Sequence, residues 1–491
     1  MIMSRRRKAF AVLIFILFST FSLLVPKYAM VNTPGGITPG GTLEEDSRFA
    51  FKVIDGLTQT PIEGAFVTSG NEVVRTDPNG MGSISVEGNR VGVRALGYSR
   101  AEMIIPPPPE TEPVSLAKGV YLFLQEELTG RTEKAIREPK EISLVPFTPK
   151  GLYLSFYGVE DRSLRESALK LIQETELNAL VIDVKGDRGM IPYKSAIPLA
   201  SEVGGQKIIT VRDMAGLMKS FKESGIYTIA RIVVFKDNLL AQKMPEWAVK
   251  TQNGQIWRDR EGLAWVDPFK REVWDYNISI AVEAARLGFD EVQFDYVRFP
   301  DASAPHFSMP NTQENRVQAI SGFLTEARKG LVPHNVFLSA DIFGYVCWNL
   351  NDTLIGQTLD HFLPHVDYLA PMLYPSGFQY GIPGYRIPTS HPYEIVYLTL
   401  KRARERTGVS SVRFRPWLQA FRDYAFDRRS FEDKEIRDQI NASEKFGSHG
   451  WMLWNPRNSY STSGLKKEGP PKVALRQRGR SPQDPGVGGV Q

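Results

Sequence analysis

Residues Gly288–Pro300, GFDEVQFDYVRFP, carry the pattern on which the assignment of the fold depends. The run Glu291–Phe299 predicts a strand, and side chains along a strand alternate between its two faces. Gln293 and Asp295 therefore share one face, while Phe294 lies on the other. An apolar face that packs under helices and a polar face that points inward are typical of a barrel strand near its mouth.

The alternation of strand and helix extends from Gly151 to Pro456. The other predicted strands are Gly151–Phe156, Ala179–Lys185, Tyr227–Phe235, Phe337–Gly344, Tyr368–Tyr374, Arg415–Phe421 and Gly450–Trp454. The amphipathic helical stretches include Leu164–Thr175, Val211–Ser224, Lys270–Leu287, Val317–Lys329 and Phe431–Phe446. Eight such units predict an α/β fold, a (β/α)₈ TIM barrel over residues 150–458. A doubly wound sheet is the alternative, but no Gly-rich phosphate loop follows the first strand.

Active sites of such barrels form at the C-terminal ends of the strands, so the inward-facing residues there are the candidates. They are Asp183 and Lys185 on the second strand, Arg231 on the third, Gln293 and Asp295 on the fourth, Asp341 on the fifth, Met372 and Tyr374 on the sixth, Trp417 and Gln419 on the seventh, and Met452 and Trp454 on the eighth. Buried charge is costly, and barrel interiors are normally aliphatic. Three acids at comparable depth therefore indicate a functional site.

Two carboxyl groups across a sugar ring are the machinery of glycoside hydrolysis. Asp295 and Asp341 lie on neighbouring strands, and a strand spacing of about 4.8 Å is compatible with the roughly 5–5.5 Å separation of retaining enzymes. We predict Asp295 as the nucleophile, kept ionised by Arg298 or Arg231, and Asp341 as the acid/base with a raised pKa. Asp183 is a second candidate for the acid.

Sugar rings stack their apolar faces on flat aromatic rings. Aromatic residues near the predicted mouth are Tyr157, Tyr296, Trp348, Tyr374, Trp417 and Trp454. Such a set favours a glycan-binding cleft. The predicted substrate-binding residues are Lys185, Arg231, Gln293, Arg298, Tyr374, Trp417, Gln419 and Trp454.

The blocks LVIDVKGDRG, ARIVVFKDN, WVDP, GFDEVQFDYVRFP, LSADIFGY, YLAPMLYPS, RPWLQAF and GWMLWNP together resemble a glycosyl hydrolase (β/α)₈-barrel family distantly similar to α-amylases. The resemblance spans nearly the whole barrel. It implies a polysaccharide hydrolase with its nucleophile at the end of strand four, on Asp295, and an acid/base on strand five, at Asp341. An Asp stands there where amylases have Glu, which leaves the second carboxylate open. It also leaves open a non-catalytic glycan- or cell-wall-binding barrel.

A second domain is predicted over residues 49–125, from short strands separated by turns. These strands are Phe49–Ile54, Ala65–Ser69, Glu72–Thr76, Met81–Val86, Arg90–Ala95 and Val120–Gln125. Their spacing predicts a small antiparallel β-sandwich. The run VIDGLTQTPIEGAFV and the later TDPNGMGSISV resemble the carboxypeptidase-regulatory-like module, which implies a spacer or adhesive role without catalysis.

The remaining segments are predicted to direct export of the protein or to connect its domains. The basic cluster Arg5–Lys8 precedes the apolar run Ala9–Val25, so residues 1–30 predict a signal peptide or an uncleaved signal anchor. The body of the protein is then extracytoplasmic, either secreted or held at the membrane. Residues 31–48 and 126–149 are predicted linkers, and residues 459–491 a disordered tail.

Composition excludes several other classes. The chain has 491 residues and a net charge of +5, much of it at the two ends, so no basic patch favours nucleic acid. Cys347 is the single cysteine, and His361 and His365 lack the Glu of a zincin pair. No Gly-x-Ser-x-Gly elbow is present. We expect no metal and no cofactor, and a polysaccharide or oligosaccharide as the partner.

Overall fold

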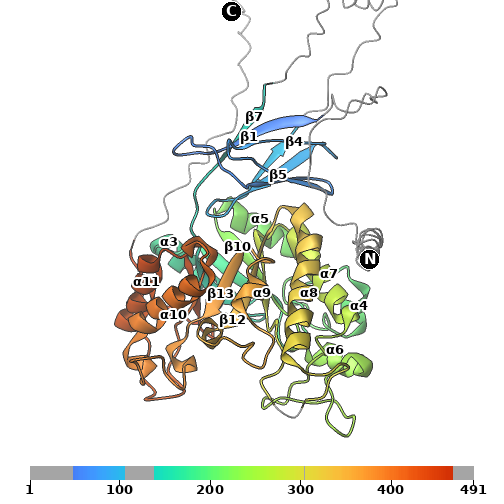
Figure 1. Ribbon diagram of the computed structural model, residues 1–491, viewed down its shortest axis with the longest axis vertical. Helices are drawn as coiled ribbons and strands as arrows, with labels where there is room; N and C mark the ends of the chain where they lie inside the picture. The colour runs from blue at the N-terminus through green and yellow to red at the C-terminus, as the bar shows by residue number, and fades with distance from the viewer. Residues whose placement is uncertain (1–47, 106–137, 303–304, 468–491) are drawn as a thin grey trace, which may run out of the picture. The chain divides into compact units, whose positions relative to one another are not determined.

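The computed structural model describes residues 48–105, 138–302 and 305–467 (Figure 1). The predicted N-terminal segment and spacer, the strand Val120–Gln125, and most of the predicted tail lie outside these residues. Among the helices that the structure describes, none has the length and apolar character needed to cross a bilayer.

Eight parallel strands close into a barrel in the order β10-β11-β12-β13-β14-β15-β8-β9. Their bounds are β8 Lys150–Leu154, β9 Ala179–Lys185, β10 Tyr227–Val233, β11 Glu291–Asp295, β12 Phe337–Phe343, β13 Tyr368–Met372, β14 Trp417–Gln419 and β15 Trp451–Trp454. The helices are α3 Arg162–Glu174, α4 Pro198–Glu202, α5 Met214–Glu223, α6 Asn238–Lys243, α7 Arg271–Arg286, α8 Gln313–Leu331, α9 Leu359–Phe362, α10 Pro392–Thr407 and α11 Asp433–Phe446. The predicted TIM barrel is confirmed.

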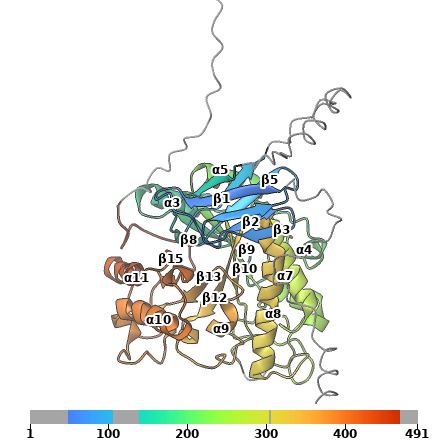
Figure 2. The ribbon, with the colours of Figure 1, turned by 45° about the horizontal axis from the view of Figure 1, so that its top comes forward.

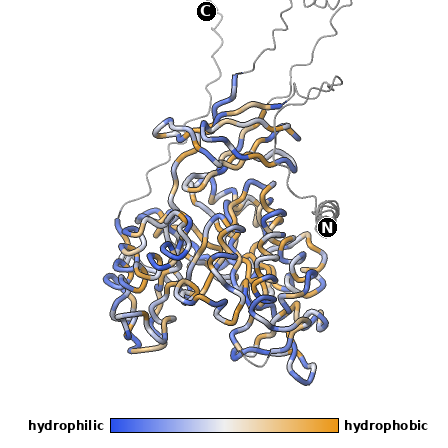
Figure 3. Tube along the Cα trace, viewed as in Figure 1, coloured by the Kyte–Doolittle hydropathy of each residue, from blue (hydrophilic) through white to orange (hydrophobic). Residues whose placement is uncertain are grey.

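Apolar side chains form two separate layers around the strands. Alternate residues such as Leu180 and Ile182 pack outward against the helices, while Val181 joins a cluster inside the barrel. Figure 3 shows hydrophobic stretches recurring through the middle of the barrel. The period-two alternation of the strands therefore explains both which face is packed and which face is free to carry polar groups.

Helix ends follow from local sequence. Asp161, Asp213 and Thr312 each accept a hydrogen bond from a backbone N–H in the first turn of α3, α5 and α8. Gly408 and Gly447 end α10 and α11 in the left-handed conformation, which glycine adopts at little cost. These signals place the boundaries of the helices between which the strands lie.

The predicted strand Glu291–Phe299 is shorter in the structure and ends at Asp295. Tyr296 has a φ of 48°, in the left-handed region that a tyrosine rarely adopts. The chain therefore turns sharply after Asp295, and Val297, Arg298 and Phe299 follow as an irregular loop at the mouth. The carboxylate predicted to be most important thus stands at the last position of its strand.

The N-terminal domain contains two sheets, β4-β1-β7 and β3-β2-β5-β6 (Figure 2). The strands are β1 Phe49–Asp55, β2 Phe66–Ser69, β3 Glu72–Arg75, β4 Met81–Ile84, β5 Arg90–Arg94, β6 Ala101–Ile104 and β7 Lys140–Leu144. Phe51, Val53, Val67, Val91 and Val93 are buried in its core. The predicted sandwich is confirmed. The edge strand β7 was not predicted.

Two segments outside the barrel strands were predicted wrongly. Strand β7 lies within the predicted linker 126–149 and pairs parallel with β1, because Ile142 and Leu144 are buried in the sandwich. The start of the predicted tail is also ordered: Tyr460 donates a hydrogen bond to the carbonyl of Tyr153 at 3.0 Å, and Leu465 is buried. Both stretches are short and are flanked by charged or Gly/Pro-rich sequence. Their few apolar residues were therefore not recognised as core residues in the sequence.

The sandwich and the barrel belong to one unit, Arg48–Gln491, and are joined by hydrogen bonds. Arg100 forms an ion pair with Asp290 at 2.8 Å, and the N–H of Gly97 donates to the hydroxyl of Tyr368 at 3.2 Å. Asp290 directly precedes β11 and Tyr368 begins β13. These two contacts between the sandwich and the barrel therefore lie at the N-terminal ends of the strands, opposite the end where barrel active sites form.

A charged pair also lies inside the lower half of the barrel. Glu291 and Arg415 are completely buried and form an ion pair at 2.5 Å. The hydroxyls of Tyr227 and Ser339 donate to the two oxygens of Glu291 at 2.9 and 2.5 Å. Glu291 begins β11 and Arg415 lies just before β14, and neither lines the pocket at the mouth, so the role of the pair is structural.

Replacing Arg415 with Met is expected to destabilise the protein by about 3–5 kcal/mol, because Glu291 would remain buried without a counter-charge. Adding Glu291→Gln should recover part of that loss. Urea unfolding of the full chain measures both. Lys434→Met, which removes an exposed pair with Asp438, should cost about 0.5 kcal/mol or less. Equal losses of unfolding free energy for Arg415→Met and Lys434→Met would contradict the structural role of the buried pair.

Candidate active site

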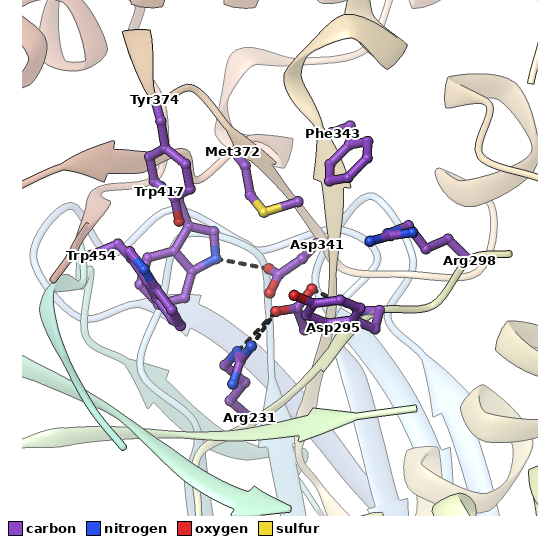
Figure 4. Close-up of a pocket in the computed structure, with 10 residues that line it drawn as sticks. Arg231, Asp295, Arg298, Asp341, Phe343, Met372, Tyr374, Trp417 and Trp454 are labelled. Carbon is purple, nitrogen blue, oxygen red and sulfur yellow. Dashed lines mark hydrogen bonds and ion pairs between the residues drawn. The ribbon is translucent and has the colours of Figure 1, made fainter. Parts of the chain in front are cut away.

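A pocket of about 150 Å³ opens at the C-terminal ends of the barrel strands (Figure 4). It is lined by Arg231, Asp295, Tyr296, Arg298, Asp341, Phe343, Met372, Tyr374, Trp417 and Trp454. These residues come from β10 to β15 or the loops that follow them. Two acids, two cations and several aromatic rings thus face one small cavity.

Asp295 is held from two directions. Its Oδ1 accepts a hydrogen bond from the backbone N–H of Tyr296 at 2.6 Å, and its Oδ2 accepts from Nε of Arg231 at 3.0 Å. A second guanidinium nitrogen of Arg231 also pairs with Oδ2. The N–H of Tyr296, directly after the end of the strand, therefore helps to orient the Asp295 carboxylate.

Arg231 is shared between two acids. Its Nη1 donates to Oδ1 of Asp183 at 2.6 Å, while Oδ2 of Asp183 accepts from the hydroxyl of Tyr153 at 2.6 Å. Burial raises the pKa of Asp183, and the charge of Arg231 opposes that rise. Asp183 is therefore occupied on both oxygens, and it supports Arg231 from behind the pocket.

Asp341 lies in a different environment. Asp341 is 1% exposed, and its Oδ1 accepts a hydrogen bond from the indole Nε1 of Trp417 at 2.8 Å. Burial and the nearby negative charge of Asp295 raise the pKa of Asp341 well above its ordinary value. A raised pKa lets a carboxyl group keep its proton to higher pH, as a general acid requires.

Aromatic rings form the rest of the wall. Trp417 and Trp454 meet edge to face with ring centroids 5.4 Å apart. Tyr153 stacks on Trp454 from below at 3.9 Å. Tyr374 and Phe343 line other parts of the pocket (Figure 4). Flat rings around a cavity with carboxyl groups match the two needs of a sugar site, stacking and hydrogen bonding.

The structure brings most of the predicted site residues together. Those that line the pocket are Asp295, Asp341, Arg231, Arg298, Tyr374, Trp417 and Trp454. Asp183 contacts the pocket through Arg231. Of the six predicted mouth aromatics, Tyr157 is 56% exposed and Trp348 donates to Thr399, and neither lines the pocket.

Lys185 is placed elsewhere, which corrects its predicted position. The register between β9 and β10 shifts after Arg231, so Lys185 pairs with the outward-facing Ile232. Its ammonium group is completely buried and forms an ion pair with Asp237 at 2.7 Å. The strand alternation therefore fails at this bulge, and Lys185 supports the surrounding structure and does not line the pocket.

The two predicted glutamines also lie outside the pocket lining. Gln293 is completely buried one layer below Asp295, and its Nε2 lies 3.7 Å from the sulfur of Met452. Gln419 donates to the hydroxyl of Ser376 at 2.7 Å and accepts from the N–H of Ser376 at 3.0 Å. It fixes the loop after β13 at the mouth. Both glutamines face inward. Gln293 lies too deep to reach the cavity, and the side chain of Gln419 is engaged by the loop after β13.

Two residues of the site were not predicted. Phe343 ends β12 on the face shared with Ser339 and Asp341, so the same alternation would have found it. Tyr153 occupies the inward face of β8 and reaches Asp183. The alternation along the predicted strand Gly151–Phe156 could have indicated Tyr153, but no residue of that strand carries a charge that would have drawn attention to its inward face.

Among residues 48–105, 138–302 and 305–467, no group of three or more His, Cys, Asp or Glu side chains is arranged to hold a metal ion. In the pocket itself, Asp295 is paired with a guanidinium and Asp341 with an indole N–H. Carboxyl groups in these positions can supply proton transfer and carboxylate attack.

A (β/α)₈ barrel with two unlike carboxyl groups in an aromatic-lined mouth has the features that glycoside hydrolysis requires. The model of the family described as "Putative glycosyl hydrolase domain" matches residues 151–460, and the chain belongs to this family. The match ends at Tyr460, whose hydroxyl bonds to the first barrel strand. The chain is thus a glycoside hydrolase by family.

Solved structures similar to this chain differ in identity and in the share of the chain that they cover. A hypothetical protein from Ruminiclostridium thermocellum ATCC 27405 is 40% identical over 39% of this chain and 96% of its own, with a TM-score of 0.35. The PgaB (BpsB) glycoside hydrolase domain from Bordetella bronchiseptica is 13% identical over 64% and 95%, with a TM-score of 0.47. Alpha-L-fucosidase isoenzyme 2 from Paenibacillus thiaminolyticus is 14% identical over 65% and 48%, at 0.44. No curated protein matches the chain.

Asp341→Asn is expected to stabilise the protein. Because the pKa of Asp341 is raised on folding, the folded state holds the proton more tightly, and stability falls as the pH rises between the unfolded and folded pKa values. An amide removes that loss and still accepts from Trp417. The melting temperature at pH 7 should rise by about 2 °C or more, and the gain should vanish at acidic pH.

Asp275→Asn on the exposed face of α7 is the matched control and should leave the melting temperature unchanged. A lower melting temperature for Asp341→Asn at pH 7 would show that Asp341 is ionised in the folded protein.

Proposed function

We propose that this protein cleaves O-glycosidic bonds of an extracytoplasmic polysaccharide by a two-carboxylate mechanism. Asp295 is the nucleophile and Asp341 the acid/base. The observation that carries the proposal is the difference between the two acids in one pocket: Asp295 is paired with Arg231, while Asp341 has no recorded cationic partner and a raised pKa. Unlike environments are what divide the roles of two carboxyl groups.

In the first step, Asp341 donates its proton to the glycosidic oxygen and the Asp295 carboxylate attacks the anomeric carbon. The carbon–oxygen bond to the leaving sugar breaks as an ester to Asp295 forms. Asp341, now a carboxylate, takes a proton from water, and the resulting hydroxyl group attacks the anomeric carbon. The ester is cleaved, the sugar leaves, and both acids return to their starting states.

The strand register supports a covalent route. β11 and β12 pair as far as Phe294 with Ala340, and Asp295 and Asp341 each follow by one residue. The two acids therefore stand side by side on neighbouring strands, about 4.8 Å apart in the backbone. Retaining enzymes hold their carboxyl groups about 5–5.5 Å apart, whereas inverting enzymes need room for a water. We therefore propose retention of configuration.

Asp183 is better suited to positioning than to proton transfer. Both of its oxygens are engaged, by Arg231 and by Tyr153, and it does not line the pocket. Its contact with substrate is indirect, through the guanidinium that also binds Asp295. These contacts favour Asp341 over Asp183 as the second catalytic carboxylate.

Asp295→Asn should abolish hydrolysis of natural glycan, by at least about 1,000-fold in kcat, because the nucleophile is lost. Asp341→Asn should lose about 100- to 10,000-fold on natural glycan but spare the first bond cleavage of aryl glycosides with good leaving groups. Reducing-end release from cell-wall and exopolysaccharide preparations, and a burst of the aryl leaving group, measure the two effects. Asp275→Asn is the control.

Several outcomes of this experiment would redirect the proposal. Equal loss on both substrate types would move the acid role from Asp341 to Asp183. Release of product with the opposite anomeric configuration, read by proton NMR, would replace the nucleophile with a general base. If wild type and Asp295→Asn bind glycan equally and neither cuts, the barrel is a binding module.

The extracytoplasmic location rests on the basic cluster Arg5–Lys8 and the apolar run that follows it. In a bacterial host, protease added to intact cells should digest a C-terminally tagged full chain, and deletion of residues 1–47 should protect it. A cytoplasmic marker that resists the same treatment is the control. Protection of the full chain would refute the proposed location, and recovery from membranes or medium would separate an anchor from a cleaved signal.

A further inference from the structure

The described residues include five buried arginines, and their partners differ. These are Arg94, Arg231, Arg298, Arg316 and Arg415. Arg231, Arg316 and Arg415 form ion pairs with buried acids. Arg298 and Arg94 have no carboxylate oxygen within 4.0 Å in this part of the chain. Of these two, Arg298 lines the active-site pocket.

The position of Arg298 is fixed without using most of its donors. It is 8% exposed, and Nη1 donates to the carbonyl of Phe299 at 2.9 Å. The guanidinium lies 4.6 Å from the ring centroid of Phe343 and 4.9 Å from those of Trp265 and Tyr296. A guanidinium has five N–H donors, and the edge formed by Nε and Nη2 has no hydrogen bond recorded among the described residues. Figure 4 shows this head directed toward the cavity.

No acid of the described residues forms an ion pair with Arg298, although Asp295 acts on its charge from more than 4.0 Å away. The Asp295 carboxylate is bound directly by Arg231 and by the N–H of Tyr296, so it does not fill the hydrogen bonds of the Arg298 guanidinium. Burial lowers the pKa of Arg298, but an arginine remains charged. A buried cation without an adjacent anion is costly to maintain. An anionic ligand in the pocket would supply the missing partner.

We propose that Arg298 binds a carboxylate carried by the sugar in this pocket, so that the substrate is an acidic polysaccharide. The inference rests on the proposed glycosidase function and names its substrate class. A planar guanidinium pairs with a carboxylate through two parallel N–H···O bonds, which the Nε/Nη2 edge provides. The three aromatic rings keep that edge in place, so binding requires little reorganisation.

A purely structural role for Arg298 makes a different prediction. If the guanidinium only supported Tyr296 and the loop after β11, its replacement would weaken acidic and neutral saccharides alike. The ratio between an acidic ligand and its neutral counterpart is therefore the informative quantity. Reducing a uronic acid to its alcohol removes the charge and leaves the ring and linkage unchanged, so the ligand itself provides the comparison without any change to the protein.

The test measures binding to the full chain carrying Asp295→Asn, which prevents cleavage during the titration. The probes are oligosaccharides of hyaluronan, alginate and polygalacturonate, each with its carboxyl-reduced form. At least one acidic probe should bind about 10- to 100-fold more tightly than its reduced form. Adding Arg298→Gln should bring that ratio close to one, and Arg298→Lys should restore part of it. Arg422→Gln, an exposed arginine in the loop after β14, is the control.

Equal affinity for acidic and reduced forms, or no binding by any acidic probe, would overturn the inference. Oligosaccharides of carrageenan and phosphomannan test sulfate and phosphate, and preferential binding of either would replace the carboxylate as the ligand. Hydrolysis by the wild-type chain is measured separately. Cleavage without an acidic preference removes the inference alone, whereas an acidic preference without cleavage removes the proposed function and leaves the binding role of Arg298.

Discussion

The geometry of the site depends on one guanidinium shared between two buried acids. Arg231 binds Asp183 through Nη1 and Asp295 through Nε, and its charge lies over the rings of Tyr153 and Trp454. None of the three charges is well solvated, so each depends on the others for compensation. Asp183 is held by Tyr153 in turn. Removing Arg231 would leave both carboxylates without their ion-pair partner, and Asp295 would lose a contact that orients it.

The same arrangement separates the properties of the two acids in the pocket. Asp295 takes the cation and a backbone N–H, whereas Asp341 has the indole N–H of Trp417 and faces the charge of Asp295. The two acids therefore lie in unlike environments, and the pKa of Asp341 is raised by burial and by the charge of Asp295. The chemistry of glycoside cleavage needs this asymmetry, which a symmetric pair of exposed aspartates would not produce.

The sequence was sufficient to predict the barrel and much of its mouth, because period-two alternation states which face of a strand a residue occupies. It does not state how deep a residue lies or where a register slips. Gln293 faces inward but lies below the cavity. Lys185 turns outward at a β-bulge, and no residue type in the sequence indicates that bulge. Strand β7 was missed because pairing with β1 joins segments about 90 residues apart, and local sequence carries no trace of such a contact.

Buried charges in this barrel differ in how completely they are paired, and that difference separates structure from function. Near the start of the strands, Glu291 and Arg415 satisfy each other, with hydroxyls on both carboxylate oxygens, and burial lowers the pKa of the adjacent His449 to about 3 so that it adds no charge. Near their ends, Asp341 and Arg298 lack partners of opposite charge within 4.0 Å among the described residues. Unpaired groups cost stability, and a site that performs chemistry retains them because the substrate completes them. The same physical criterion that gives the lower pair a structural role therefore supports the proposed roles of Asp341 and Arg298 toward the substrate.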